Sequence, residues 1–348
     1  MKTTKFGGKK HGVRYCSVCK TKLQKNGTEC GKQRWRCPSC KTAKILKRPD
    51  IANRNREQTH RNYLLSKETA KDTAKRHRIS HRTFTRNYSS IKRSGSCHAP
   101  IGQSGADKRQ FTYCPYLVID ATGLNHEVVA IVHSGKVVLT WRFASYESSL
   151  LWEQTLYGFN ALAIVSDGQK GIQKAIANLW GDSVILQRCH FHVKQNMRTK
   201  LTNNPESEAG KDLKWLVSFM GHVKDEHRMA VFVGIFNELY EQHHSFLSER
   251  TFSKNPDSKH KWFYTHRRVR SAYRQIADLI ARDQLFAYIT HPELNLPNTT
   301  NCVEGGINAR LGELIRAHRG MFPERQRLLV VEFLRSKMER DVTSKANA

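Results

Sequence analysis

The stretch Tyr116-Leu-Val-Ile-Asp120 decides how this chain folds, because it is an apolar run that ends on a carboxylate. A second stretch of the same kind is Ala161-Leu-Ala-Ile-Val-Ser-Asp167. Short apolar runs rich in β-branched residues predict buried strands. A carboxylate at the tip of such a strand is costly to desolvate unless a cation meets it. We therefore expect Asp120 and Asp167 to share a cation at one edge of a sheet.

The order of elements around these strands predicts an α/β fold. Three strands are expected first, at residues 116–120, 127–133 and 136–143, with a two-residue turn at Ser134-Gly135 joining the last two. A helix, a strand, a helix, a strand and a helix are then expected at residues 146–158, 161–166, 168–179, 183–187 and 190–201. This succession resembles that of a ribonuclease-H-like fold, and the resemblance implies that the first strand is central and the fourth lies beside it. That arrangement would bring Asp120 and Asp167 together.

A third acid, Glu304, is expected to complete the group from a final helix that crosses the sheet. It lies in Thr299-Thr-Asn-Cys-Val-Glu-Gly-Gly306, where Asn301 is one helical turn before it and two glycines allow a close backbone approach. Glu293 and Glu313 compete for the same role. Each acid, taken singly, also has an ordinary explanation, and Asp167 in particular suits the N-cap of the next helix.

Three carboxylates in this arrangement predict a site for two divalent ions, Mg²⁺ or Mn²⁺. Mg²⁺ prefers oxygen ligands and needs only a few carboxylates besides substrate phosphates. Two such ions suit chemistry on a phosphodiester. We expect Asp120 to bridge both ions, and Asp167 and Glu304 to hold one each.

Charge indicates a polyanionic partner. The 348-residue chain has a formal net charge of +29 and a hydrophobic fraction of 39%. Residues 1–110 hold 29 Lys and Arg against 6 Asp and Glu, whereas the remainder holds 30 against 24. Such a basic first third favours double-stranded DNA as the partner, although a basic solvated face would have the same composition. We expect no membrane span and no secretion signal.

Cysteine spacing near the N-terminus predicts a structural zinc site. Cys16-Ser-Val-Cys19 and Cys37-Pro-Ser-Cys40 form two C-x₂-C pairs separated by 17 residues, which is the spacing of a zinc ribbon. Cys30 is a fifth cysteine and an alternative ligand. A cluster of free thiols is the alternative to a zinc site, but it does not suit so short a span. Arg34 and Arg36 lie on a basic strand that leads into the second pair, and we expect them to contact DNA.

A helix-turn-helix is expected next in the chain. Apolar positions between residues 66 and 91 are spaced for one buried face, with a break near Arg78-Ile-Ser80. The second helix, residues 81–91, would enter the major groove, with Arg82, Thr83 and Arg86 as its DNA contacts. An ordinary basic helical hairpin is the alternative. The expected organisation is a basic tail (1–14), zinc ribbon (15–46), helix-turn-helix (50–93), linker (94–112) and catalytic domain (113–335) with an all-helical insertion at about 206–290.

One more motif, Cys189-His-Phe-His192, follows the second aspartate. Two ligands one helical turn apart do not complete a zinc tetrahedron, and a buried thiol with a surface histidine explains the spacing equally well.

At this point residues 113–335 resemble the mutator-type insertion-sequence transposases. The resemblance is carried jointly by Val118-Ile-Asp120-Ala-Thr-Gly, Val165-Ser-Asp167-Gly-Gln-Lys-Gly171, Cys189-His-Phe-His192 and Thr300-Asn-Cys-Val-Glu304-Gly-Gly-Ile-Asn308. It implies that Asp120, Asp167 and Glu304 are the catalytic metal ligands, with Cys189, His192 and Asn301 as associated motif residues.

The resemblance also implies a reaction, in which the protein binds the terminal inverted repeats of its element, cuts the ends and joins them to target DNA. A DNA-binding regulator with a decayed catalytic domain and a hydrolytic nuclease are the alternatives. We expect a homodimer, because two ends must be handled together. Cysteines held as metal ligands indicate a reducing compartment, so we expect a cytoplasmic, nucleoid-associated protein of a bacterium.

Overall fold

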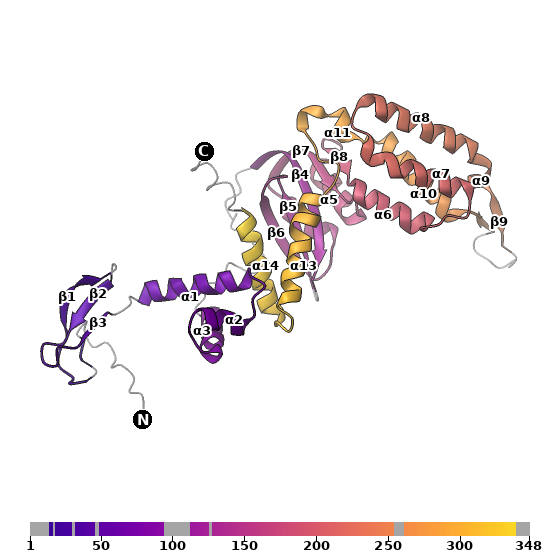
Figure 1. Ribbon diagram of the computed structural model, residues 1–348. Helices are drawn as coiled ribbons and strands as arrows, with labels where there is room; N and C mark the ends of the chain where they lie inside the picture. The colour runs from indigo at the N-terminus through magenta and orange to yellow at the C-terminus, as the bar shows by residue number, and fades with distance from the viewer. Residues whose placement is uncertain are drawn as a thin grey trace. The chain divides into compact units, whose positions relative to one another are not determined.

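The computed structural model describes residues 14–16, 18–29, 32–45, 49–93, 112–124, 127–253 and 261–338. They belong to two compact units, Met1–Ser96 and Cys97–Ala348, and each unit is described by itself (Figure 1). The expected basic tail, Cys30 and the expected linker lie outside the described residues, except for their boundary residues Arg14 and Thr112. In the described part of the chain, no helix has the length and apolar character needed to cross a membrane.

The first unit begins with a small antiparallel sheet. Its three strands pair in the order β1 (Gln24–Glu29), β2 (Lys32–Arg36) and β3 (Ala43–Ile45). The apolar core beneath it consists of Cys16, Leu23 and Cys37, with Trp35 packed against them. So few buried residues cannot stabilise a fold by hydrophobic burial alone. The cysteines therefore have to contribute in another way.

Three helices follow, namely α1 (Pro49–Leu64), α2 (Ala70–Arg76) and α3 (His81–Arg93). Helix α3 begins at His81, where the second helix was expected to start. Ser80 caps this end by accepting the Thr83 backbone N–H at 3.1 Å. Ala74 and Phe84 are buried between the helices, and the His60 ring stacks on Phe84 at 5.1 Å. The helices on either side of the turn are confirmed, and their role in binding DNA stays a prediction.

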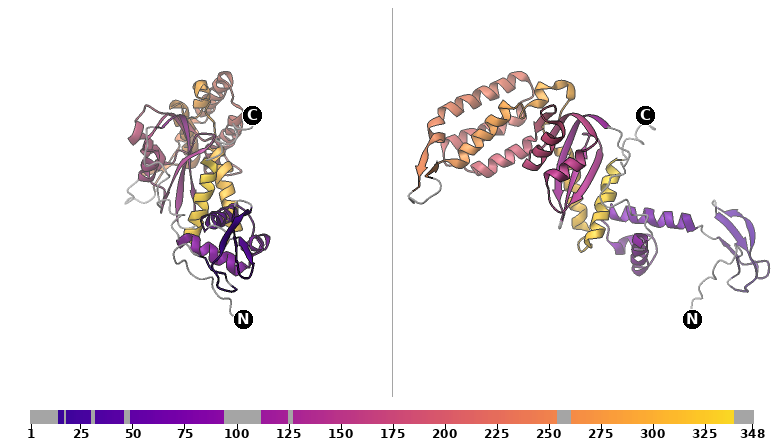
Figure 2. Two further views of the ribbon diagram at one scale, coloured as in Figure 1. Left: turned by 90° about the vertical axis from the view of Figure 1, so that its left-hand side faces the viewer. Right: turned by 180° about the vertical axis from the view of Figure 1, so that it is seen from behind.

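The second unit is built on a mixed five-stranded sheet (Figures 1 and 2). The strand order is β6-β5-β4-β7-β8, with β4 antiparallel to β5 and parallel to β7. The first strand is therefore central and the fourth lies beside it, as the sequence predicted. The strand bounds are β4 (Thr112–Gly123), β5 (Val128–His133), β6 (Val138–Ala144), β7 (Phe159–Ser166) and β8 (Ile185–Arg188).

Side-chain alternation on β4 separates a core face from a face that carries the acid. Leu117 and Ile119 are fully buried in the cluster formed with Leu151 and Trp152 of α4 (Ser149–Leu156) and with residues of α5 (Lys170–Trp180). Because successive side chains of a strand point to opposite faces, Asp120 points away from this core. The final helices pack on its side, where α12 (Asn301–Val303) contacts β4 and β5.

The elements that follow α12 in the chain continue along the face of the sheet that carries Asp120. They are the π-helix η3 (Glu304–Asn308), α13 (Ala309–Ala317) and α14 (Pro323–Met338). The helix α14 packs against β6. The other helix that follows the sheet, α6 (His190–Leu201), has the bounds that the sequence predicted.

The insertion between α6 and α12 has its own hydrophobic core, to which Leu213, Phe232, Tyr273 and Ile276 contribute. The expectation that it is all-helical is wrong, because β9 (Arg250–Phe252) and β10 (Trp262–Tyr264) form an antiparallel pair. Their aromatic and β-branched residues favour extended backbone. The helical elements are α7 (Glu208–Phe219), η1 (Met220–His222), α8 (Glu226–Gln242), α9 (His244–Ser248), α10 (Arg267–Ala281), α11 (Ala287–Thr290) and η2 (Pro292–Leu294).

Two local expectations for the sheet are also corrected. Asp120 does not end its strand, because pairing with β5 continues to Gly123 while pairing with β7 stops at Val118. The connection between β5 and β6 spans Ser134–Val137 rather than two residues, and Gly135 within it has a φ of 85°. The ladder shifts register at Val132/His133, which lengthens the turn.

Candidate functional site

Asp120 occupies the point where two strands diverge, immediately beyond the last residue pair between β4 and β7. Its exposed fraction is 6%. Burial, the nearby His192, which opposes it, and the Asp167 and Glu304 carboxylates, which add to it, together raise the pKa of its carboxyl to about 7. A cation would stabilise the ionised form of a carboxyl group in such surroundings, so Asp120 marks a candidate cation-binding position.

Asp167 follows β7 directly and faces the same position. Its Oδ1 accepts the Gln169 backbone N–H at 2.9 Å. Helix α5 has Gln169 as its N-cap, so Asp167 forms a local turn and does not cap the helix. Its backbone carbonyl accepts a hydrogen bond from Arg188 Nη2 at 2.6 Å.

Gly168 makes room for that arginine. Its φ is +71°, and a Cβ built there would lie 1.7 Å from Arg188 Cζ. Arg188 is itself buried, which lowers its pKa, while Asp167 has the opposite effect. A glycine is therefore required on both conformational and steric grounds, and it allows the guanidinium to lie against the Asp167 backbone.

His192 is the third member of the closest group. Asp120, Asp167 and His192 each offer an atom suited to metal binding, and these atoms all lie within 4.8 Å of one another. Interaction with the Cys189 thiol and with the Asp120 and Glu304 carboxylates raises the pKa of His192 to about 9, against the lowering effect of burial.

Cys189 connects His192 to the final helical segment. The thiol is fully buried and accepts hydrogen bonds from Thr300 N and Thr300 Oγ1, each at 3.3 Å. Burial raises its pKa, but the hydrogen bonds with His192 and Thr300 outweigh that effect and leave it lowered. The buried thiol of the alternative explanation is present, although it is hydrogen-bonded. The surface histidine is not, because His192 is partly buried and faces the acids.

Glu304 approaches the group from the π-helix η3. Its carboxylate does not join the three atoms within 4.8 Å, yet it lies near enough to raise the pKa of Asp120 and of His192. A π-helical turn is rare and is often found at functional sites. Here it follows Asn301, whose Oδ1 would lie 2.5 Å from a Cβ on Gly305, so Asn301 packs over that glycine.

The two competitors of Glu304 do not face Asp120. The Glu293 side chain is 64% exposed and lies 3.5 Å from His291 Nδ1. Glu313 is exposed on α13. Neither contributes to the pKa of Asp120, whereas Glu304 does.

Sequence reasoning assigned no role to Asn308, although it belongs to the motif quoted above. Its Nδ2 donates a hydrogen bond to Asp120 Oδ2 at 2.9 Å, and its Oδ1 is buried without a partner among the described residues. It lies four residues after Glu304, and a spacing of four on a helix indicates that both side chains lie on the same face. Glu147 was also missed: burial raises its pKa, Asp167 adds to that increase, and Trp152 Nε1 donates to its Oε1 at 2.8 Å.

The four predicted zinc ligands come together in the first unit. Cys16 Sγ and Cys40 Sγ are 3.5 Å apart, Cys19 Sγ and Cys37 Sγ are 3.3 Å apart, and all four lie within 4.8 Å of one another. Tetrahedral Zn–S bonds of about 2.3 Å require sulfur separations of about 3.8 Å. Hydrogen bonding with Thr21 lowers the pKa of Cys19 to about 5, which favours the thiolate form that binds metal, whereas burial and the neighbouring thiols raise the pKa of Cys37 to about 11. The donor set therefore fits zinc.

The predicted DNA contacts differ in their surroundings. Arg36, Arg82 and Arg86 are exposed. Arg34 is also exposed and lies 3.7 Å from Glu29. Thr83 is engaged locally, because its hydroxyl lies 2.8 Å from Ser80 Oγ at the start of α3.

Comparisons with known proteins add little to this geometry. No protein-family model and no curated protein matches the chain. Among solved structures, one similar chain is the catalytic core domain of BIV integrase, with 14% identity over 48% of this chain and 98% of that chain, and a TM-score of 0.18. That score is too low to carry an argument. The chain itself defines an α/β unit with a buried carboxylate group and a separate four-cysteine cluster.

Proposed function

We propose that this protein is a DNA transposase with a ribonuclease-H-like catalytic domain. It would bind the terminal inverted repeats of its insertion sequence and perform metal-dependent strand cleavage and strand transfer at Asp120, Asp167 and Glu304. The proposal rests on the proximity of Asp120, in the central strand β4, to Asp167, which follows the neighbouring strand β7. Glu304 lies close to Asp120. The net charge of +29 supports nucleic acid as the substrate.

The residues around the cluster fit a divalent ion. Asp120, Asp167 and Glu304 offer the hard oxygen ligands that Mg²⁺ or Mn²⁺ prefers, and their mutual repulsion needs a positive charge. The unpartnered Oδ1 of Asn308 is a further oxygen in the same place. Two ions bound there would supply Lewis-acid activation of the attacking and leaving oxygens of a phosphodiester.

The protein's own residues prepare that centre. Asn308 fixes the orientation of the Asp120 carboxylate, and Arg188 fixes the backbone that presents Asp167. His192 and Cys189 link the centre to Thr300, close to the start of the segment that carries Glu304. Such supporting contacts hold ligands in one geometry.

The first unit would recognise the element ends. A zinc ribbon held by Cys16, Cys19, Cys37 and Cys40 and a helix-turn-helix with Arg82 and Arg86 exposed on α3 are suited to that task. A homodimer is part of the proposal, because two ends have to be processed together.

Cleavage and strand transfer can be separated in one assay. The full-length protein is incubated with Mg²⁺, a supercoiled target plasmid and a labelled duplex carrying the DNA that flanks its gene. We expect nicked ends with 3′-hydroxyls and covalent joint molecules, and neither product without added divalent ion. Cleavage without joining would indicate a hydrolytic nuclease, and binding without either product would indicate a DNA-binding regulator.

Replacing Asn308 by leucine tests the support of Asp120. The side chain keeps its approximate size but loses the donor to Asp120 Oδ2. We expect Mn²⁺ affinity, measured by calorimetry, to fall by about 10- to 100-fold, the usual effect of removing such a contact. The matched control is Asn178→Leu, which removes a 2.7 Å bond to the Glu153 carboxylate remote from the site. Equal losses in the two variants would refute the assigned role.

A further inference from the structure

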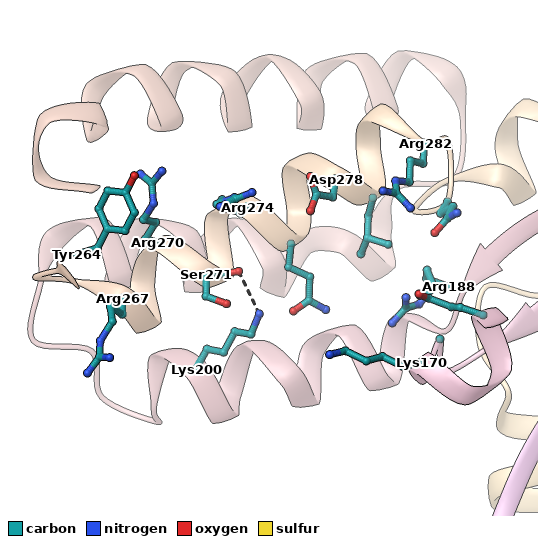
Figure 3. A pocket seen from close by; sticks show the side chains of 15 residues that line it. Lys170, Arg188, Lys200, Tyr264, Arg267, Arg270, Ser271, Arg274, Asp278 and Arg282 are labelled. Carbon is teal, nitrogen blue, oxygen red and sulfur yellow. Dashed lines mark hydrogen bonds between the residues drawn. The ribbon is translucent and has the colours of Figure 1, made fainter. Parts of the chain in front are cut away.

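A strongly basic cavity of about 610 Å³ lies between α5, α6 and α10 (Figure 3). Lys170, Arg188 and Lys200 line it from α5, β8 and α6. The opposite wall is α10 with its C-cap residue, from which four arginines contribute: Arg267, Arg270, Arg274 and Arg282. We call this cavity the α10 channel.

The α10 channel concentrates positive charge in the two thirds of the chain whose charges are otherwise nearly balanced. Residues 111–348 contain 30 Lys and Arg against 24 Asp and Glu. Among the described residues that line the channel, Asp278 is the one acid. Seven Lys and Arg residues thus line the channel against one acid, and such a local surplus is the electrostatic footprint of a polyanion-binding surface.

The arginines form a row along one side of α10. Their spacing of three, four and eight residues keeps them on one helical face, and like charges at such spacings destabilise a helix. At 1.5 Å per residue, the row from Arg267 to Arg282 is about 22 Å long. That length corresponds to about six phosphates of one duplex strand at about 3.4 Å each.

Internal contacts orient these cations without neutralising them. Lys200 Nζ donates to the Ser271 carbonyl at 3.0 Å, and Arg270 lies over the Tyr264 ring at 3.8 Å and donates to the Leu247 carbonyl. The Nε atoms of Arg188 and Arg270 are buried without a partner in the described part of the chain. No channel cation forms an ion pair with a described acid. Their charge is left for a ligand.

One end of the α10 channel adjoins the acidic cluster. Gly168 and Arg188 line that end, and Arg188 donates to the Asp167 carbonyl at 2.6 Å. Figure 3 shows Arg188 and Lys170 at this end and Arg267 with Tyr264 at the other. A polyanion bound along the row would therefore extend from the carboxylates to the far end of α10.

From this geometry we infer that the α10 channel binds the phosphate backbone of duplex DNA next to the bond that reacts at the acidic cluster. The inference rests on the proposed function and names a second DNA surface, separate from the ribbon and the α2–α3 helices. Its role is to position the strand, since the row of guanidinium groups contacts phosphates and reads no bases.

The test is the salt dependence of DNA binding by the full-length protein. Arg274→Gln with Arg282→Gln removes two exposed channel charges, and Lys174→Gln with Lys224→Gln removes two exposed charges outside the channel. Binding to a 40-base-pair duplex is measured from 50 to 200 mM salt without added divalent ion or chelator. Loss of two phosphate contacts should reduce the slope of log K against log salt by about 1.8.

The channel variant and the control variant should therefore differ in the slope of log K against log salt. Over that salt range, parent and control should lose about tenfold more affinity than the channel variant. A parental slope in the channel variant, or equal changes in both variants, would overturn the inference. Arg267→Gln with Arg274→Gln is the second channel variant, and circular dichroism verifies folding. Because no catalysis occurs without Mg²⁺, a failure here would leave the strand-transfer assay unaffected, and a failure of that assay would leave this measurement valid.

Discussion

Asp120→Asn is expected to eliminate strand cleavage and strand transfer while stabilising the metal-free protein. The activity should fall about a thousandfold or more, since losing about 4 kcal/mol of charge stabilisation at phosphorus has that effect on rate. Binding to DNA should persist, because the basic surfaces are unchanged. Retained Mg²⁺-dependent cleavage would remove Asp120 from the proposed centre.

The stability change follows from the pKa of Asp120. Burial raises it from the ordinary 3.8 to about 7, so the folded protein binds this proton more tightly than the unfolded chain does. Folding stability therefore decreases as the pH rises from about 4 to about 7, and it stays reduced above that range. Asparagine is uncharged throughout. The variant should gain at most about 4 kcal/mol, at about 1.4 kcal/mol per pKa unit.

Denaturant unfolding at several pH values, without divalent ions, measures this effect. The difference between variant and parent should grow between pH 4 and pH 7 and then level off. Asp182→Asn, at an exposed turn after α5, is the control and should show no such trend. An Asp120→Asn variant that is inactive because it is unfolded would lack the stability gain, so the two causes are distinguishable.

Cys37→Ser should remove the zinc and unfold the small sheet of the first unit. Cys37 is fully buried, and its Sγ lies 3.3 Å from Cys19 Sγ. The apolar core around it is too small to replace metal binding, which in zinc-finger peptides contributes about 10–16 kcal/mol. Zinc measured by elemental analysis should fall from about one per chain to near zero, and hydrogen exchange of β1–β3 should accelerate.

Cys30→Ser is the matched control for that experiment. It makes the same substitution in the same segment, at a cysteine that is not one of the four proposed ligands, so zinc should remain at about one per chain. A loss of zinc in this variant, with retention in Cys37→Ser, would show that Cys30 is the ligand instead. A chain that contains no zinc in its parental form would contradict the site altogether.

Features of the fold that depend on a few consecutive residues could be predicted from the sequence. The apolar run before Asp120 identified the central strand, because a strand needs only a few consecutive buried residues. The spacing of Cys16, Cys19, Cys37 and Cys40 identified the four-cysteine cluster, since a tight turn brings each pair together. The expected all-helical insertion failed at β9 and β10, where pairing between separate segments overrides the helical pattern around them.

The arrangement of the candidate site depended on contacts that no local pattern contains. Asn308 meets Asp120 across 188 residues, and Thr300 meets Cys189 across 111. Helix propensities of single residues do not predict the π-helical turn that carries Glu304 and Asn308. It directly follows α12, which packs against β4 and β5. His192 was predicted as an associated residue, and only the fold put it within 4.8 Å of the aspartates.

The sequence by itself therefore determined the succession of elements, the acidic residues and the cysteine spacing, because periodicity and spacing act over short distances. The order of the strands in the sheet was expected only from the resemblance to a known fold. Tertiary structure alone decided which groups surround Asp120, and it gathered the basic residues of α5, β8, α6 and α10 into one channel. The physical reason is that burial, electrostatic repulsion and desolvation depend on distances in space. Residues far apart in the chain set those distances only once the sheet and the helices have packed.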